Sequence, residues 1–385
     1  MRDKLACEND QISNFVYSLS NMPDHRDNRG KKKKLLPVVI IVGFVMAILV
    51  GRSSTSSIHR YIFNKINMLR ELTGYSDAEP ISRAHLPRFL NRLDWVILND
   101  LIEQHFGIRL KRNENEEWVA IDGKVLRGTI KGGDKQTIIL AVTHDSREVI
   151  AQARQEGKKS SEIPVVRILL KNTGLEKQKI TLDAHHCNPL TTALINQAGG
   201  SYVIQVKGNQ PILLEQFRTL GTSEKSSYED VEKAHGRLTT RLVGVFSMDS
   251  LNLDQRWENS GLKTLAVVKR ETTTTSTNKT SLETSWYVSN CPIDLNNESQ
   301  TATEMAQVIR NHQGVESDNY IRDKTFKEDD VKTKNGNQGQ IMGRLRGLGM
   351  WLIRKTKTHN FQAKIEEFID CPDTLGSMLK SQNVL

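Results

Sequence analysis

The alternation of apolar and polar residues between Ile180 and Gln210 predicts a strand, a helix and a second strand. A short apolar run at Ile180–Leu182 stops at an acid. Helical spacing of apolar residues then follows from Pro189 to Ala198, and Tyr202–Val206 has the pattern of a strand. A strand–helix–strand unit of about 30 residues implies parallel strands joined by a right-handed crossover.

Two polar residues stand where these strands end. Asp183 follows the first strand and Lys207 follows the second. In such units, ligands and catalytic groups gather at the carboxyl ends of the strands. We therefore expect Asp183 and Lys207 to lie side by side at one edge of the sheet, and we look for chemistry at that edge.

The longest apolar run, Leu35–Val50, contains 16 residues without a charge. A membrane-spanning helix needs about 20 apolar residues, and this run includes Pro37 and Gly43. The basic run Lys31–Lys34 would suit a cytoplasmic flank, but the sequence has no second such apolar segment. These observations favour a buried helix over a membrane anchor, and solubility without detergent would separate the two.

The first 112 residues are predicted to be helical throughout. Ser53–Ser57 offers cap residues for a following helix, and apolar residues at helical spacing predict another helix from His85 to His105. The resulting domain is interpreted either as a simple helical bundle or as a DNA-binding module.

Strand patterns begin at residue 118. Trp118–Ile121 is a short apolar strand, and Gln136–Val142 and Val149–Arg154 are joined by a turn so short that they must be antiparallel. Glu162–Leu170 has helical spacing and leads back to the strand at Ile180–Leu182.

A β-rich insertion is predicted at about residues 220–298, after a helix at Ile212–Phe217. Its strands are Leu238–Phe246, Thr264–Lys269 and Glu283–Ser289, with Glu271–Thr280 as a polar hairpin tip or loop. Helical spacing returns at Thr303–Asn311 and Gly343–Lys355. We expect three parts: a helical domain at 1–112, a core at 113–355 and a tail at 356–385.

The charge of the chain indicates a class of partner. The chain has 54 Lys and Arg against 45 Asp and Glu, a net charge of +9. That surplus favours a polyanion such as nucleic acid.

Four scattered cysteines without paired spacing indicate a reducing compartment and argue against a disulfide framework or a zinc ribbon. The run His185–Cys187 has no partner pair, so zinc is disfavoured there.

Three acids form the candidate catalytic set. Asp122 is expected to end the strand at Trp118–Ile121, and it becomes a neighbour of Asp183 if the strand at Ile180–Leu182 adds beside that first strand. Glu316, which is expected to follow a helix, can supply the third carboxylate. Two divalent ions held by such carboxylates can clamp the attacking and leaving oxygens of a phosphodiester exchange.

With these acids in place, the sequence resembles the D-D-E insertion-sequence transposases of the H-repeat-associated type, from about residue 23 to residue 353. The motifs that carry the resemblance appear in the family's order. They are Ala120–Lys124 with Arg127-Gly128, Lys159–Pro164, Thr181–Ala184, Tyr202–Gln210, His235–Arg237, Arg310–Glu316 and Thr325–Asp330.

The resemblance implies an α+β fold, with a ribonuclease H-like core whose mixed sheet is flanked by helices and carries the β-rich insertion. It implies that Asp122, Asp183 and Glu316 are the catalytic and metal-binding triad for two Mg²⁺ or Mn²⁺ ions. It also implies cleavage at the ends of an insertion element and transfer of the freed 3′ hydroxyls to target DNA. The partners would be double-stranded DNA and a second copy of the chain in a synaptic homodimer, without a membrane, in the bacterial cytoplasm at the nucleoid.

The candidates for contact with DNA come from the same motifs. They are Lys124, Arg127, Lys207, Arg237, Arg310 and His312.

The last motif departs from the family. Gln313 stands where the family usually has tryptophan, and Asp318–Tyr320 stands where it usually has Leu-His-Trp. A second hypothesis therefore stays open, that of a catalytically inactive DNA-binding protein derived from a transposase. Glu328 and Asp323 lie near enough in sequence to be alternative third ligands.

Overall fold

The computed structural model describes residues 14–23, 35–106, 117–130, 136–155, 162–219, 227–234, 236–294, 296–330, 332–333, 336–358 and 360–385. The chain divides into two compact units. The helical unit comprises Met1–Arg109, Val125–Gln136 and Tyr320–Leu385, and the sheet unit comprises Leu110–Lys124 and Thr137–Asn319. Each unit is described by itself.

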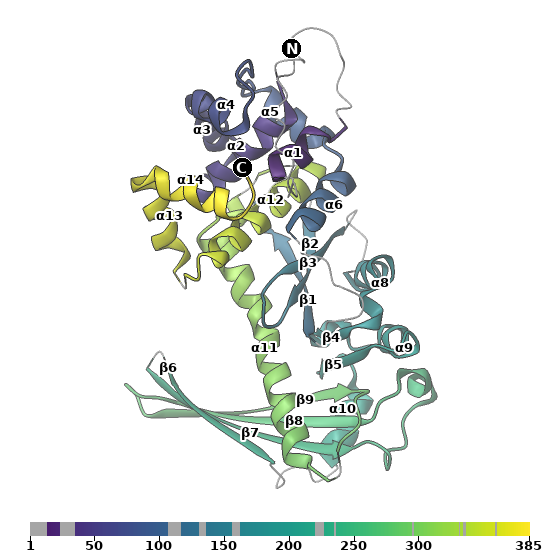
Figure 1. Cartoon of the computed structure of the whole chain (residues 1–385). Coiled ribbons are helices and arrows are strands. Elements are labelled where there is room, and N and C mark those ends of the chain that lie inside the picture. Colours follow the sequence, from purple (N-terminus) through teal and green to yellow (C-terminus); the bar gives the residue numbers. More distant parts are fainter. Residues whose placement is uncertain are drawn as a thin grey trace. The chain divides into compact units, whose positions relative to one another are not determined.

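The sheet unit is built on one nine-stranded sheet in the order β3-β2-β1-β4-β5-β9-β8-β7-β6 (Figure 1). The strands are β1 (Trp118–Leu126), β2 (Gln136–Thr143), β3 (Val149–Gln155), β4 (Lys179–Leu182), β5 (Ser201–Val206), β6 (Tyr228–Ala234), β7 (Arg237–Ser247), β8 (Thr264–Thr274) and β9 (Lys279–Ser289). The main helices are α8 (Glu162–Thr173), α9 (Pro189–Gln197), α10 (Pro211–Thr219) and α11 (Glu298–Lys324). This mixed sheet flanked by helices confirms the predicted α+β class.

The predicted parallel unit is confirmed in its elements and in its pairing. β4 pairs in parallel with β1 on one side and with β5 on the other, and β2 pairs antiparallel with β3. One boundary was wrong. β1 continues to Leu126, so Asp122 lies inside the strand and not at its end. The pairing with β4 ends at Ile121, however, so Asp122 still follows the last paired residue.

The β-rich insertion continues the same sheet, because β9 pairs antiparallel with β5. Its hairpin is longer than predicted. β8 and β9 stay paired out to Thr274 and Lys279, so most of the expected polar loop at Glu271–Thr280 is strand. The pattern did not predict β6, because its residues alternate between exposed and half-buried and none is fully buried.

Helix α11 contains 27 residues and is longer than the predicted Thr303–Asn311. Ala302, Met305 and Val308 pack against buried residues of β5, β7 and β8, which fixes the first half of the helix on the sheet. Glu316 therefore lies within a helix and not after one, as the sequence had suggested.

The helical unit surrounds α2 (Pro37–Leu49), in which every residue from Val38 to Leu49 is buried. Its other helices are α1 (Phe15–Ser20), α3 (Thr55–Asn64), α4 (Ile66–Thr73), α5 (His85–Arg92), α6 (Trp95–Phe106), the short α7 (Arg127–Ile130), α12 (Gly336–Lys355), α13 (Phe361–Asp370) and α14 (Pro372–Ser381). The predicted buried helix is thus confirmed, and among the residues described no helix has the length and apolar character to cross a membrane.

Two predictions about the starts of helices had different outcomes. Ser54 caps α3 through a reciprocal capping box with Ser57, as expected from the run of hydroxyl residues. The single helix predicted at His85–His105 is two helices. The side chain of Asp94 accepts the backbone N–H groups of Val96 and Ile97, which starts α6 anew.

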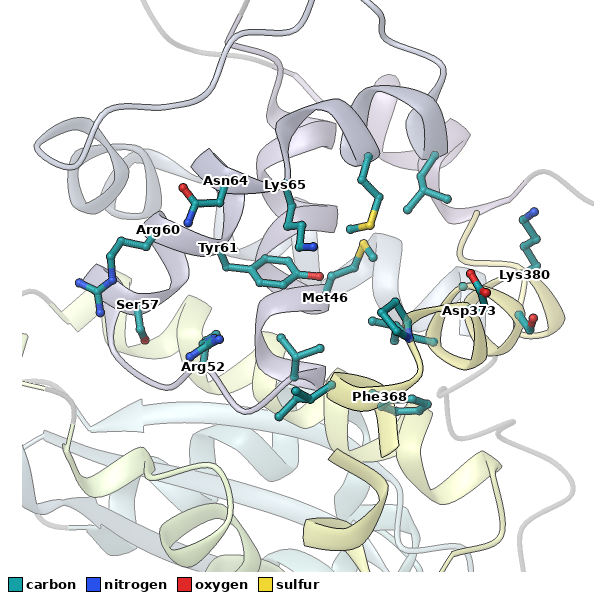
Figure 2. A pocket seen from close by; sticks show the side chains of 18 residues that line it. Met46, Arg52, Ser57, Arg60, Tyr61, Asn64, Lys65, Phe368, Asp373 and Lys380 are labelled. Atoms are coloured by element: carbon teal, nitrogen blue, oxygen red, sulfur yellow. The ribbon is translucent and has the colours of Figure 1, made fainter. Parts of the chain in front are cut away.

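A cavity of about 760 Å³ opens in the helical unit among residues of α2, α3, α4, α13 and α14. Figure 2 shows its polar side chains, including Arg60 and Lys65 on one wall and Asp373 and Lys380 on another. Burial raises the pKa of Tyr61 in this wall to about 12, so its phenol stays neutral at physiological pH.

Several stretches named from the sequence lie outside the described residues. They are Lys31–Lys34, residues 159–161 of the Lys159–Pro164 motif, and His235.

Candidate active site

The first two acids of the candidate triad come from adjacent parallel strands. Ile121 of β1 is in register with Leu182 of β4, and each is followed directly by an acid, Asp122 and Asp183. The carboxyl ends of the two strands therefore present both acids at one position of the sheet. The side-chain amide of Asn319 on α11 donates to Asp122 Oδ2 at 3.0 Å and fixes that carboxylate.

The pKa of Asp122 reflects the acids around it. It is raised from 3.8 to about 6, mainly by burial and next by the negative charge of Asp183. A hydrogen bond from the Gly123 backbone acts in the opposite direction, while Glu162 and Glu316 also raise the pKa. A pKa raised by burial and by neighbouring carboxylates is typical of functional sites.

Glu316 reaches the site from α11. It is exposed, and it lines a hollow of about 330 Å³ together with Asp183 and Lys207. Asp183 and Lys207, which we predicted to lie close together, therefore both lie on the wall of one hollow. Asp183 and Glu316 thus line one hollow, and the charges of both contribute to the raised pKa of Asp122.

A buried network lies beside these acids. The Thr181 hydroxyl is 2.9 Å from His144 Nε2 and 2.8 Å from His312 Nδ1. Burial lowers the pKa of His144 to about 3 and that of His312 to about 4, so both rings are neutral at physiological pH. The same hydroxyl donates to the Val119 carbonyl at 3.5 Å, and the tautomer of each ring sets whether that ring donates to the hydroxyl or accepts from it. This network joins α11 to β4 four residues before Glu316.

A fourth acid, Glu162, stands at the first position of α8. Its Oε1 is 3.0 Å from Nε2 of His186, a ring that is 1% exposed and whose Nε2 is 3.9 Å from Asp183 Oδ1. Neither Glu162 nor His186 was singled out as a site residue from the sequence. The only indication in the sequence was that Glu162 belongs to one of the motifs that carry the resemblance to the transposase family. That motif alone assigns no role to Glu162.

Comparison with known proteins decides the family. Residues 113–348 match the family described as the transposase DDE domain. The chain belongs to this family. It is 24% identical to the "H repeat-associated putative transposase YhhI" of Escherichia coli K12 over 90% of this chain and 92% of the relative. It is 26% identical to the "Putative transposase YncI" of Escherichia coli O157:H7 over 90% and 88% of the two chains, and 25% identical to "Putative protein YbfL" of Escherichia coli K12 over 90% and 92%.

Membership in the DDE transposase family supports a role in DNA transposition, and the predicted resemblance to H-repeat-associated transposases is confirmed. The matched range, residues 113–348, contains the three candidate acids.

The DNA-contact candidates of this transposase occupy different environments. Lys207 is exposed on the wall of the hollow, and His312 is half-buried beneath it in the Thr181 network. Lys124 is only 6% exposed, so its ammonium group is enclosed by protein. Arg127, in the helical unit, has a side chain that is 80% exposed and lies 3.5 Å from Asp329.

The remaining two candidates belong to the insertion and to α11. Arg237 is exposed at the start of β7. Arg310 is held by two carboxylates, with Nη1 at 2.7 Å from Asp230 and Nη2 at 3.0 Å from Glu232. Arg241 of β7 pairs with the same two acids, so β6 neutralises two arginines that face the hollow.

The alternative third ligand Glu328 is occupied elsewhere. Its side chain is 2% exposed and lies 3.5 Å from Arg322 and 3.9 Å from Arg346, both also buried. A carboxylate enclosed by two guanidinium groups is not available to a metal ion. Glu316 therefore remains the candidate for the third acid.

The donor chemistry of the transposase site fits hard divalent cations, which prefer carboxylate oxygen. Among the residues that the structure describes, no three His, Cys, Asp or Glu side chains are already arranged around a common metal position. After burial, the charges of Asp183 and Glu316 both raise the pKa of Asp122, so the three acids lie within electrostatic range of one another.

Proposed function

We propose that this transposase cuts DNA at the ends of an insertion element and transfers the 3′ hydroxyls to target DNA, using two divalent ions held by Asp122, Asp183 and Glu316. One observation carries the proposal. Asp122 and Asp183 each follow the last residue paired between β1 and β4, Glu316 of α11 lines one hollow with Asp183, and burial together with the charges of both acids raises the pKa of Asp122. Convergence of three carboxylates from distant segments is what metal-assisted phosphodiester exchange requires.

The residues of the chain would take distinct parts in the reaction. Bound divalent ions would activate the attacking oxygen and stabilise the leaving oxygen. Asn319 orients Asp122 through its amide. Lys207 offers an exposed cation at the wall of the hollow, where a phosphate of the scissile strand would approach. His312 holds α11, and with it Glu316, against Thr181.

The inactive-copy hypothesis rests on the departures in the last motif. One of the residues that depart from the family, Asn319, contacts the candidate site, because its side-chain amide donates to Asp122 Oδ2 at 3.0 Å. A residue that supports a catalytic carboxylate favours an active enzyme over a degenerate one. The proposal includes a homodimer that pairs two element ends, acting in the bacterial cytoplasm at the nucleoid.

A strand-transfer assay tests the proposal. The purified full chain would be incubated with labelled duplexes that carry the ends of its own flanking element, together with plasmid target and Mg²⁺ or Mn²⁺. We expect cleaved ends with free 3′ hydroxyls and covalent joint products, both abolished by EDTA. Specific binding without cleavage under any divalent ion would favour the inactive DNA-binding protein.

DNA affinity should depend strongly on salt. The net charge is +9, and each phosphate contact contributes about 0.9 to the slope of log affinity against log salt. Binding should persist in Ca²⁺, which supports little chemistry. An affinity that hardly changes between low and moderate salt would contradict a broad phosphate contact.

A further inference from the structure

The carboxylate of Glu162 lies directly against β1, beside the first acid of the triad. A Cβ built on Gly123 would sit 2.3 Å from Glu162 Oε1 and 2.7 Å from Oε2. Glu162 thus occupies the space that any side chain at position 123 would need. The negative charge of Glu162 also contributes, after burial and Asp183, to the raised pKa of Asp122, the residue before Gly123.

A second contact fixes the direction of Glu162. Its Oε1 is 3.0 Å from Nε2 of His186, the last residue of a short 3-10 helix, Ala184–His186, that is separated from the end of β4 by Asp183. The same nitrogen is 3.9 Å from Asp183 Oδ1. One imidazole therefore stands between Glu162 and the second acid of the triad, while Gly123 makes room beside the first.

A purely structural role would account for part of this arrangement. An acid in the first turn of a helix is stabilised by the helix dipole, and such residues are common. That role does not require the carboxylate to reach a neighbouring strand or a buried histidine. The side chain also stays 26% exposed, so it is open to a ligand.

We propose that Glu162 is a fourth carboxylate of the divalent-cation site and that His186 is its positioning residue. This inference rests on the proposed metal-dependent function and adds a ligand that the D-D-E triad lacks. Carboxylate oxygen is the donor that Mg²⁺ and Mn²⁺ prefer, and a ligand held by a buried hydrogen-bond partner is ordered before the ion arrives.

Mn²⁺ binding by the full chain without DNA tests the inference separately from activity. The unbound ion would be measured by electron paramagnetic resonance in titrations of wild type, Glu162→Gln and Asp122→Asn. Glu162→Gln keeps the shape and an acceptor for His186 but removes the charge. We expect it to raise the Mn²⁺ dissociation constant by about tenfold or more. Glu304→Gln, an exposed glutamate of α11 that bonds Gln300, is the control and should bind like wild type.

Gly123→Ala provides an independent perturbation. The group in its way is the end of a flexible side chain, so Glu162 should move aside while β1 keeps its fold. We expect a similar loss of Mn²⁺ affinity, and no further loss when Gly123→Ala is added to Glu162→Gln. Gly208→Ala is the matched control, because its Cβ would meet nothing within 4 Å.

His186 is tested by rescue. His186→Leu should weaken Mn²⁺ binding, and His186→Gln, which retains an N–H donor, should recover most of it. Circular dichroism would confirm that each variant is folded. Equal loss in the two variants would contradict a positioning role through the hydrogen bond.

The outcomes separate this inference from the proposed function. If Asp122→Asn loses Mn²⁺ while Glu162→Gln and Gly123→Ala bind like wild type, the fourth ligand is wrong and the triad stands. If wild type binds no Mn²⁺, or if binding survives Asp122→Asn, the proposed metal-dependent function itself is wrong and the fourth ligand is rejected with it.

Discussion

The guanidinium of Arg147 lies across Gly314 of α11, where a Cβ would sit 1.0 Å from Arg147 Nη1. The same Nη1 donates to the carbonyl of Asn311 at 3.2 Å. Arg147 belongs to the turn between β2 and β3 and adopts a left-handed backbone with φ of 55°. This contact holds α11 against the sheet two residues before Glu316, and it requires a position without a side chain.

Replacing Gly314 by Ala should therefore impair catalysis with little effect on folding. The added methyl displaces the flexible end of Arg147, so α11 loses that contact and Glu316 shifts. Because misplacement of about 1 Å can cost about 100-fold in rate, we expect DNA cleavage to fall at least tenfold. Single-turnover cleavage at saturating DNA would measure it.

The control for this prediction is Gly376→Ala on α14, where a Cβ would meet nothing within 4 Å. Combining Gly314→Ala with Arg147→Ala should give a rate no lower than Arg147→Ala alone. A wild-type rate in Gly314→Ala would show that the Arg147 contact does not position Glu316.

Asp122 should destabilise the metal-free protein at neutral pH. Its pKa rises from 3.8 to about 6 on folding, so the folded chain binds this proton more tightly than the unfolded chain does. The stabilisation of the folded chain that comes from binding this proton is fully present below pH 3.8, and it is lost as the pH rises through about 6. Asp122→Asn should therefore raise the unfolding free energy at pH 8 in EDTA by about 1–3 kcal/mol.

The same substitution should have little effect near pH 4, where Asp122 is already protonated in the folded chain. Urea unfolding at both pH values would measure the difference. A loss of stability at pH 8 in Asp122→Asn would contradict unbalanced repulsion among the acids. Saturating Mg²⁺ should stabilise wild type and leave the variant unchanged.

His144 and His312 should make the protein sensitive to mild acid. Both pKa values fall from 6.5, to about 3 and about 4, so the folded chain keeps the rings neutral while the unfolded chain protonates them. Their stabilising contribution is present above pH 6.5 and is lost as the pH falls toward 4. Each histidine should contribute a slope of about 1.4 kcal/mol per pH unit.

His144→Gln keeps a hydrogen-bonding partner for Thr181 and cannot titrate in this range. In urea unfolding between pH 6 and 5, this substitution should remove about half of the combined slope of the unfolding free energy that the two histidines contribute. His185→Gln, at an exposed position, is the matched control. An unchanged slope in His144→Gln would contradict the buried, neutral ring.

The buried pair of Arg322 and Arg346 depends on Glu328. Glu328→Ala removes the negative charge that lies beside the two enclosed guanidinium groups. This loss should destabilise the helical unit by about 3–5 kcal/mol. Hydrogen exchange of the α12 amides would report the loss. Glu366→Ala on the exposed side of α13 should change it by less than about 0.5 kcal/mol. An unchanged exchange rate in Glu328→Ala would show that other groups balance the two arginines.

Local patterns sufficed for the parallel strands of the site. The apolar run before Asp183 and the strand before Lys207 place both residues at the ends of neighbouring strands, and β4 does add beside β1. These predictions succeed because short buried strands and the helix between them are encoded within about 30 contiguous residues.

Glu316 and Glu162 show where local patterns fail. The polar stretch after His312 has little helical signal of its own, and α11 continues through it because Thr181 and Arg147 contact it from elsewhere in the sequence. Glu162 meets His186 across 24 residues, and no periodicity predicts that contact. The strand β6 was missed for the same reason, since its acids pair with Arg241 and Arg310 rather than with a core.

The most direct test of the triad is single-turnover cleavage of an element-end duplex by wild type and Glu316→Gln, with Mg²⁺ and at a protein concentration that saturates the DNA. The amide keeps the shape of the side chain and removes the charge that a divalent ion needs. We predict cleavage by wild type, and a loss of at least about 1,000-fold in Glu316→Gln with unchanged DNA affinity. Wild-type cleavage by Glu316→Gln would contradict the assignment of Glu316 as the third acid.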